Sequence, residues 1–250
     1  GLVMNRLGMA EGRVRAPHAR RSTPRTWRGL ERRRVAAVFC GLGQPRGRAR
    51  PANVLTAASR LTPGAPGYAV ELVAVGGGKI VTAGGIELVA RRAARNVRGA
   101  IDTVLVPGGV GTGDGGRAVV PHLVRLAKRA RRVVGVCSGA FILGEAGLLE
   151  GRRAATHWAV CDLLAQRHPG CQVDADAIYV RDGRVWTSAG VTAGMDLALA
   201  LVEADHGAEL ALEVARWLVL YLRRPGGQSQ FSAPLVPVSP QPSMSSGSPP

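Results

Sequence analysis

The sequence contains few aromatic residues and few acidic ones. Phe, Trp and Tyr make up only 4% of its 250 residues, although hydrophobic residues make up 46%. The core must therefore consist mainly of Val, Leu, Ala and Ile, which suits a parallel sheet covered by helices. The four cysteines form no Cys-x-x-Cys pair and no secretory signal is evident, which predicts reduced thiols in the cytoplasm. No apolar run is long enough to span a bilayer, so no membrane contact is expected.

Positive charge is concentrated at the start of the chain. Of the net charge of +16, residues 1–60 carry +12, from 14 arginines against two acids, whereas the other 190 residues carry only +4. We therefore expect residues 1–33 to be a disordered basic leader, with a nucleic-acid-binding arm or an organelle transit peptide of low serine content as the alternatives. One α/β domain is expected over residues 34–224. Residues 225–250, of which 17 are Pro, Ser or Gly, are expected to be a disordered tail.

Strand patterns and helix patterns alternate along the domain. Apolar β-rich runs at 34–39, 68–75, 101–106 and 131–136 predict strands, while periodic segments at 54–61, 119–130, 192–204 and 208–222 predict helices. A further helix is expected from an N-cap at Thr156 to about residue 168. Hairpins are expected at 80–89 and around Asp182-Gly183. This alternation predicts a doubly wound, mostly parallel sheet whose ligands bind at the carboxyl ends of the strands.

Gly135-Val-Cys137-Ser-Gly139 is the segment most suggestive of chemistry. It joins a predicted strand to a predicted helix, and a cysteine flanked by glycines at such a junction is typical of a nucleophile elbow. The start of the following helix would favour the thiolate of Cys137. The alternative is a buried, unreactive cysteine in a turn of small residues.

A cysteine nucleophile also needs a base and a pocket for the developing oxyanion. His157 is the candidate base, because one helix and one loop separate it from Cys137 and can return the chain to the elbow. Gly108 and Gly109 follow a predicted strand, so they should lie at the same edge of the sheet. The main-chain N–H groups of Gly109 and Ser138 are the candidate oxyanion donors.

Two other motifs are weak. Gly111–Gly116 formally matches the dinucleotide fingerprint, but no acid follows about twenty residues later, where Arg131 and Arg132 stand. His157 and Cys161 share a helical face, yet no second pair completes a tetrahedral metal site. We therefore predict neither a cofactor nor a metal.

Several segments together resemble a known superfamily. Val133–Leu149, Ala155–Trp158 and Thr187–Asp196 are similar to class I glutamine amidotransferase-like proteins of the DJ-one/PfpI type. Within that group, Leu105–Gly109 and Arg223–Ser232 are most similar to the sensor domain of AraC-family transcriptional regulators. The resemblance implies a flavodoxin-like sheet with helices on both faces, Cys137 at the elbow, a nearby histidine and a homodimer.

The chain departs from this family in two places. Asn53 stands where family members usually carry a carboxylate that hydrogen-bonds the cysteine, and an amide cannot share a proton in that way. The preceding Gly41–Arg50 is so unlike the expected pattern that a reading-frame disturbance is suspected. Residues 233–250 show no helical periodicity, so nucleic acid would be bound only through a helix-turn-helix domain missing here.

Two functional hypotheses follow. In the first, the domain senses a small amine or amide-like metabolite bound near Cys137, with Asp196 either lining the pocket or capping its helix. In the second, the protein is a free-standing PfpI-like cysteine hydrolase or isonitrile hydratase-like enzyme that uses Cys137 and His157.

Overall fold

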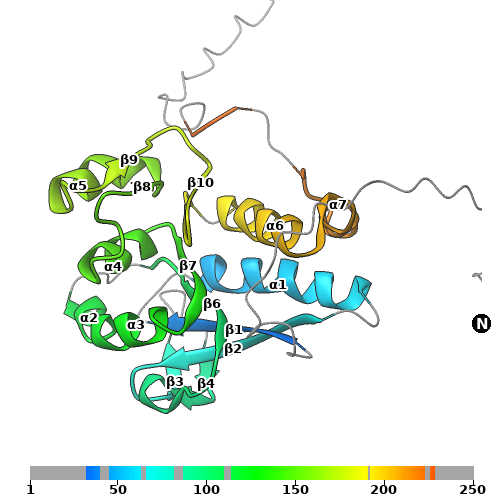
Figure 1. The fold of residues 1–250 in the computed structure, drawn as a ribbon, viewed down its shortest axis with the longest axis horizontal. Helices are drawn as coiled ribbons and strands as arrows, with labels where there is room; N and C mark the ends of the chain where they lie inside the picture. Colours follow the sequence, from blue (N-terminus) through cyan, green and yellow to red (C-terminus); the bar gives the residue numbers. More distant parts are fainter. Residues whose placement is uncertain are drawn as a thin grey trace, which may run out of the picture. The chain divides into compact units, whose positions relative to one another are not determined.

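The computed structural model describes residues 32–39, 45–62, 66–81, 87–109, 114–190, 192–222 and 226–228 (Figure 1). The expected leader lies outside these ranges except for Arg32 and Arg33, which belong to the first strand. Of the expected tail, only residues 226–228 are described, and the side chains of residues 45–50 are not. Within the described part, no helix is long and apolar enough to cross a membrane.

Seven strands form one sheet. They are β1 (Arg32–Phe39), β2 (Gly67–Ala74), β5 (Arg92–Ala93), β6 (Ile101–Val106), β7 (Ala130–Val136), β10 (Tyr179–Asp182) and β11 (Val185–Ser188), and their order is β10-β11-β7-β6-β1-β2-β5. All neighbours pair in parallel except β10 and β11. If β1, β2, β6, β7 and β11 are counted from one to five, the order is 2-1-3-4-5, which is the flavodoxin order. The predicted fold class is confirmed.

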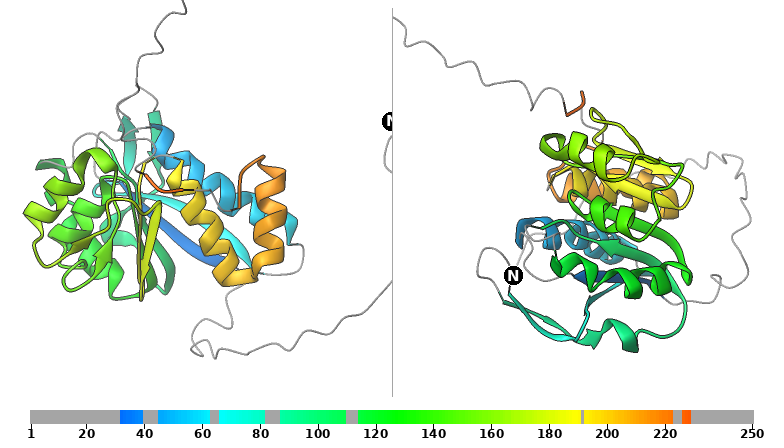
Figure 2. Two further views of the ribbon diagram at one scale, coloured as in Figure 1. Left: turned by 90° about the horizontal axis from the view of Figure 1, so that it is seen from above. Right: turned by 90° about the vertical axis from the view of Figure 1, so that its left-hand side faces the viewer.

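Helices cover both faces of this sheet (Figure 2). One face carries α1 (Pro45–Leu61), α6 (Ala193–His206) and α7 (Ala208–Trp217), and the other carries α3 (Val120–Ala127) and α4 (Gly139–Glu145). The remaining helices are α2 (Asp114–Arg117) and α5 (Cys161–Arg167). Along β1, Val35 and Ala37 join the first core while Ala36 and Val38 join the second. Strands buried on both faces explain the nearly continuous apolar runs in the sequence.

Both predicted hairpins are present. The first is formed by β3 (Gly78–Val81) and β4 (Glu87–Ala90), and the second by β10 and β11. Gly183, at the tip of the second, has a φ of +56°, which a glycine adopts without strain. A parallel pair, β8 (Arg153–Ala154) and β9 (Gln172–Val173), was not predicted, because two residues are too few to show a period.

Two helix predictions were wrong in detail. Thr156 does not cap a helix, because its hydroxyl donates to a main-chain carbonyl elsewhere. Instead His157 caps a 3-10 turn, Trp158–Val160, and α5 begins only at Cys161. The last helix ends at Trp217 rather than at residue 222, since Val219 has a φ of +54°, outside the helical region. At the other end of the chain, α1 begins at Pro45, earlier than predicted.

Candidate functional site

Cys137 lies in a strained turn at the carboxyl end of β7. Its φ is +55°, although it is not a glycine, and α4 begins two residues later at Gly139. Its main-chain N–H donates to the carbonyl of Ser188 over 2.9 Å, which ties the turn to the end of β11. Positive φ at a non-glycine residue costs free energy and is frequent at functional sites. The chain therefore has the geometry of a nucleophile elbow.

Neighbouring glycines allow the elbow to pack closely. A Cβ on Gly108 would lie 2.7 Å from the Cβ of Cys137 and 2.8 Å from the carbonyl oxygen of Val136. A Cβ on Gly139 would overlap the carbonyl oxygen of Val106. The ends of β6 and β7 thus approach each other so closely that no side chain fits between them, and Gly108 lies beside Cys137 as the topology predicts.

Ser138 holds the peptide groups of Gly109. Its Oγ accepts a hydrogen bond from the Gly109 N–H over 2.9 Å, and its hydroxyl lies 3.0 Å from the Gly109 carbonyl oxygen. The N–H of Gly109, predicted as an oxyanion donor, is therefore already engaged. Stabilising an anion there would require the Ser138 hydroxyl to move away.

Burial raises the pKa of the Cys137 thiol above its ordinary value. The main-chain N–H and the hydroxyl of Ser138 hydrogen-bond the sulfur and favour the thiolate, but they do not offset burial. Burial thus outweighs the groups that favour the thiolate, and α4, whose start is predicted to favour it as well, is only seven residues long.

His157 lies beside Gly190, which follows the end of β11. Its Nδ1 accepts a hydrogen bond from the Ala159 N–H over 3.2 Å, and its ring lies against Gly190, where a Cβ would come within 2.9 Å of Cδ2. Among the described residues, no hydrogen bond joins it to Cys137. Because the Nδ1 lone pair accepts the Ala159 N–H, this nitrogen is not free to act as a base.

Thr156 hydrogen-bonds the main chain of Cys137. Its hydroxyl donates to the carbonyl oxygen of Cys137 over 2.9 Å, and the residue is fully buried. Its own carbonyl accepts a hydrogen bond from the side chain of Gln228 over 3.0 Å. The sequence pattern predicts a helix cap at Thr156 and a disordered tail that includes Gln228, so it reveals neither of these contacts.

The two remaining candidates have different surroundings. Asn53 is exposed on α1, and no hydrogen bond joins it to Cys137 in the described part of the chain. Asp196 is 8% exposed in the first turn of α6. That turn reaches the elbow, because a Cβ on Gly194 would lie 3.0 Å from Cγ1 of Val136. Asp196 is thus placed near the carboxyl end of β7, whereas the side chain of Asn53 meets solvent.

The described residues contain no group of three or more His, Cys, Asp or Glu side chains that could hold a metal ion. The Cys161 thiol lies 3.5 Å from the carbonyl oxygen of His157, so it faces the main chain rather than the imidazole. The glycine-rich loop is only partly described, since residues 110–113 lie outside the described ranges.

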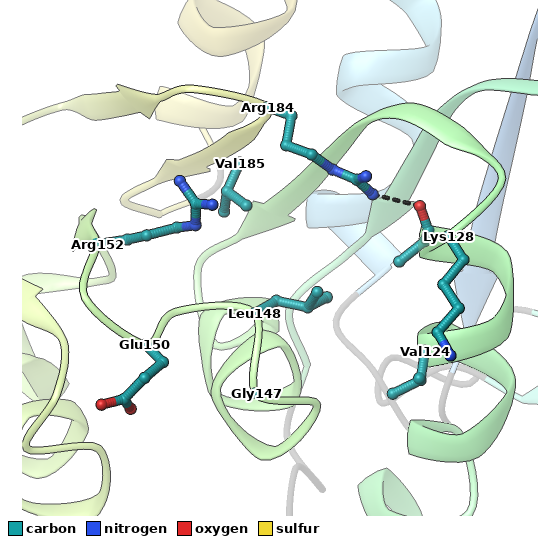
Figure 3. Close-up of a pocket in the computed structure, with 9 residues that line it drawn as sticks. Val124, Lys128, Gly147, Leu148, Glu150, Arg152, Arg184 and Val185 are labelled. Atoms are coloured by element: carbon teal, nitrogen blue, oxygen red, sulfur yellow. Dashed lines mark hydrogen bonds between the residues drawn. The ribbon is translucent and has the colours of Figure 1, made fainter.

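A pocket of about 290 Å³ lies at the opposite end of the strands (Figure 3). It is found where β7 and β11 begin, between Lys128, Leu148, Arg152 and Arg184. Its arginines are engaged by the protein: Arg152 pairs with Asp182 over 3.1 Å, and Arg184 donates to the carbonyl of Ala127. This pocket is separate from the elbow.

Comparison with known proteins identifies the family. Residues 49–204 match the model of the DJ-1/PfpI family, and this range includes the elbow, His157 and Asp196. The chain belongs to the DJ-1/PfpI family. The superfamily predicted from the elbow motif is therefore confirmed.

Relatives within the family differ in activity. An isonitrile hydratase from Pseudomonas putida is 42% identical over 113 residues, which are 44% of this chain and 48% of that protein. The HTH-type transcriptional regulator CdhR from Pseudomonas aeruginosa is 40% identical over 113 residues, 44% of this chain and 33% of the regulator. The matched part thus spans about half or less of the length of these relatives.

Solved structures show the same fold. An AraC family transcriptional regulator from Pseudomonas putida has a TM-score of 0.66 at 24% identity, covering 74% of this chain and 98% of that one. A THiJ/PfpI family protein from Pseudomonas syringae also has a TM-score of 0.66 at 24% identity, covering 84% of this chain and 85% of that one.

Proposed function

We propose that this domain is the ligand-sensing part of an AraC-type transcriptional regulator, and that it binds a small amine or amide-like metabolite beside Cys137. It would act in the cytoplasm as a homodimer, and DNA would be bound by a helix-turn-helix domain outside the residues that the structure describes. The observation that carries the proposal is the elbow itself: the strained turn is kept, but the groups that would make its cysteine a nucleophile are engaged elsewhere or absent among the described residues.

Three features support binding rather than turnover. Burial keeps the Cys137 thiol neutral, and thiols attack electrophiles as thiolates. The Nδ1 of His157 is committed to the Ala159 N–H. The N–H of Gly109 is committed to the Ser138 Oγ. Such a site still presents a polarisable sulfur, two main-chain glycines and the start of α6 to a small molecule.

The alternative is an isonitrile hydratase-like enzyme, and the 42% identical relative favours it. In that reaction one water adds to R–NC to give the formamide R–NH–CHO. The sulfur of Cys137 would first add to the isonitrile carbon while the thiol proton passes to that carbon, which gives the thioimidate R–N=CH–S–Cys. Water would then attack the same carbon, one of its protons would pass to the nitrogen, and the sulfur would leave with the other as the thiol. This route needs a thiolate and a base, so the Nδ1 of His157 would have to release the Ala159 N–H.

One experiment separates the two functions. The purified chain is heated with ethanolamine, acetamide, L-glutamine or cyclohexyl isocyanide while its unfolding is followed, and each mixture is then examined by proton NMR. A sensor predicts that an amine or amide at about 100 times its Kd raises Tm by roughly 5–10 °C and is recovered unchanged. The matched variant Cys137→Leu, which fills the site, should lose the shift. Steady conversion of the isocyanide to its formamide would overturn the proposal.

A further inference from the structure

After the last helix, residues 226–228 form a short separate segment (Figure 1). Its Gln228 hydrogen-bonds residues 154–160, which we call the elbow loop. Gln228 is only 3% exposed. Its side chain uses both ends of the amide: Oε1 accepts from the Trp158 N–H over 2.9 Å, while Nε2 donates to the carbonyls of Thr156 and Ala177 over 3.0 and 2.9 Å. Its main-chain N–H donates to the Asp176 carbonyl over 2.8 Å.

These contacts require glutamine chemistry. One acceptor and two donor hydrogens at the end of a side chain match one main-chain N–H and two carbonyls, and the primary amide supplies this set. A carboxylate of the same shape would accept from Trp158 but would face two carbonyls without a hydrogen to donate. Because Gln228 is buried, each unmatched group would cost free energy.

Only one residue separates Gln228 from the elbow. Thr156 accepts from Gln228 with its carbonyl and donates to the Cys137 carbonyl with its hydroxyl. Two residues further along the elbow loop, the N–H of Trp158 donates to Gln228, and His157 lies between Thr156 and Trp158. A displacement of the Cys137 turn would therefore move Thr156, and with it the loop that is hydrogen-bonded to Gln228.

We infer that Gln228 is a positioning residue for the site at Cys137, and that its hydrogen bonds to Thr156 and Trp158 are coupled to the binding of a ligand at that site. This inference rests on the proposed function, because it supplies the step by which a sensor would pass its signal to the chain beyond residue 228. Coupling of this kind is reciprocal. A group bound at Cys137 weakens the hydrogen bonds of Gln228, and removal of the Gln228 side chain makes the Cys137 turn more mobile.

The first test uses the wild-type chain. Cys137 is alkylated with iodoacetamide, and amide hydrogen exchange is followed in peptides that cover residues 154–160 and 226–228. We expect exchange of the Trp158 and Gln228 amides to become about tenfold faster. A Cys137→Ala chain treated identically is the control for alkylation of other cysteines. Unchanged exchange at both amides would overturn the inference, and because the probe is iodoacetamide this result would leave the ligand-sensing proposal standing.

The second test uses three variants. Gln228→Ala should raise the rate of Cys137 alkylation about tenfold over wild type, whereas Gln166→Ala, an exposed glutamine on α5, should not change it. Gln228→Glu is expected to approach the wild-type rate at low pH, where the protonated acid can donate, and to depart from it as pH rises. A purely structural residue would give no such pH-dependent ratio. Equal alkylation rates in all chains at every pH would contradict the coupling.

Discussion

The hydroxyl of Thr156 donates a hydrogen bond to the carbonyl oxygen of Cys137 over a distance of 2.9 Å. Thr156 is fully buried and Cys137 is half-buried, and the contact fixes the strained turn from the side of the elbow loop. Cys137 also donates its N–H to Ser188. The turn is therefore held by neighbours on two sides, which is what a positive φ at a non-glycine residue requires.

Replacing Thr156 with valine should reveal the strength of this contact. Valine keeps the shape but removes the donor, so the Cys137 carbonyl loses its partner in a buried place. We expect the free energy of unfolding to fall by about 1–3 kcal/mol, measured by chemical denaturation. Thr56→Val, at an exposed position on α1, is the matched control and should have little effect. Equal effects at the two positions would show that the hydrogen bond does not stabilise the turn.

A second prediction concerns the contact between the ends of β6 and β7. Gly108→Ala would place a Cβ 2.7 Å from the Cβ of Cys137, so the strand ends must separate. We expect a loss of at least about 2 kcal/mol in unfolding free energy and faster alkylation of Cys137. Gly76→Ala is the control, because a Cβ there meets nothing within 4 Å. If Gly108→Ala were as stable as Gly76→Ala, the close approach would be wrong.

A third prediction concerns a buried ion-pair cluster at the opposite end of the strands. Asp205, whose side chain is 1% exposed, pairs with Arg132 over 2.5 Å and with Arg131 over 2.7 Å. Burial alone would raise the pKa of Asp205, but Arg132, Arg131 and Arg33 lower it to about 2. Asp205→Asn removes a negative charge beside the buried Arg132 and should lower the free energy of unfolding by on the order of 3 kcal/mol. Asp162→Asn, at an exposed position, should change it little.

The same cluster predicts a dependence on pH. The folded-state pKa of Asp205 is below its unfolded value of about 3.9. Its contribution to stability is therefore complete above pH 4 and is lost as pH falls from there toward 2. Denaturation curves of wild type and Asp205→Asn should converge over this interval. A difference that stays constant down to pH 2 would contradict the assigned pKa.

Much of the fold follows from local sequence patterns. The runs 34–39 and 101–106 are nearly uniform in apolar residues because both faces of β1 and β6 are covered, and such runs are read directly as buried strands. Asp182-Gly183 predicts its hairpin because the turn needs positive φ. The two-residue strands β8 and β9 have no pattern of their own, since distant neighbours create them.

The site was harder to predict than the fold. Cys137 and Ser138 are candidates because the elbow needs small residues at fixed spacing, and Gly108 is one because it follows a strand that ends at the same edge of the sheet. The role of Thr156 was not predicted, because a threonine before a helix-like segment is usually a cap and nothing local reveals that its hydroxyl contacts a residue 19 positions earlier. Gln228 was missed for the same reason, since its partners lie more than 50 residues away.

In the proposed function, Cys137 contacts its ligand as a neutral thiol. The direct measurement is the rate of Cys137 alkylation by iodoacetamide from pH 5 to pH 11, followed by mass spectrometry of its peptide, with the thiols of Cys161 and Cys171 read in the same digest. Because burial raises the pKa of Cys137, the account predicts an inflection above the ordinary value of about 8.5 and little reaction at pH 7. An inflection below pH 7 would show a thiolate at neutral pH and would favour the enzyme.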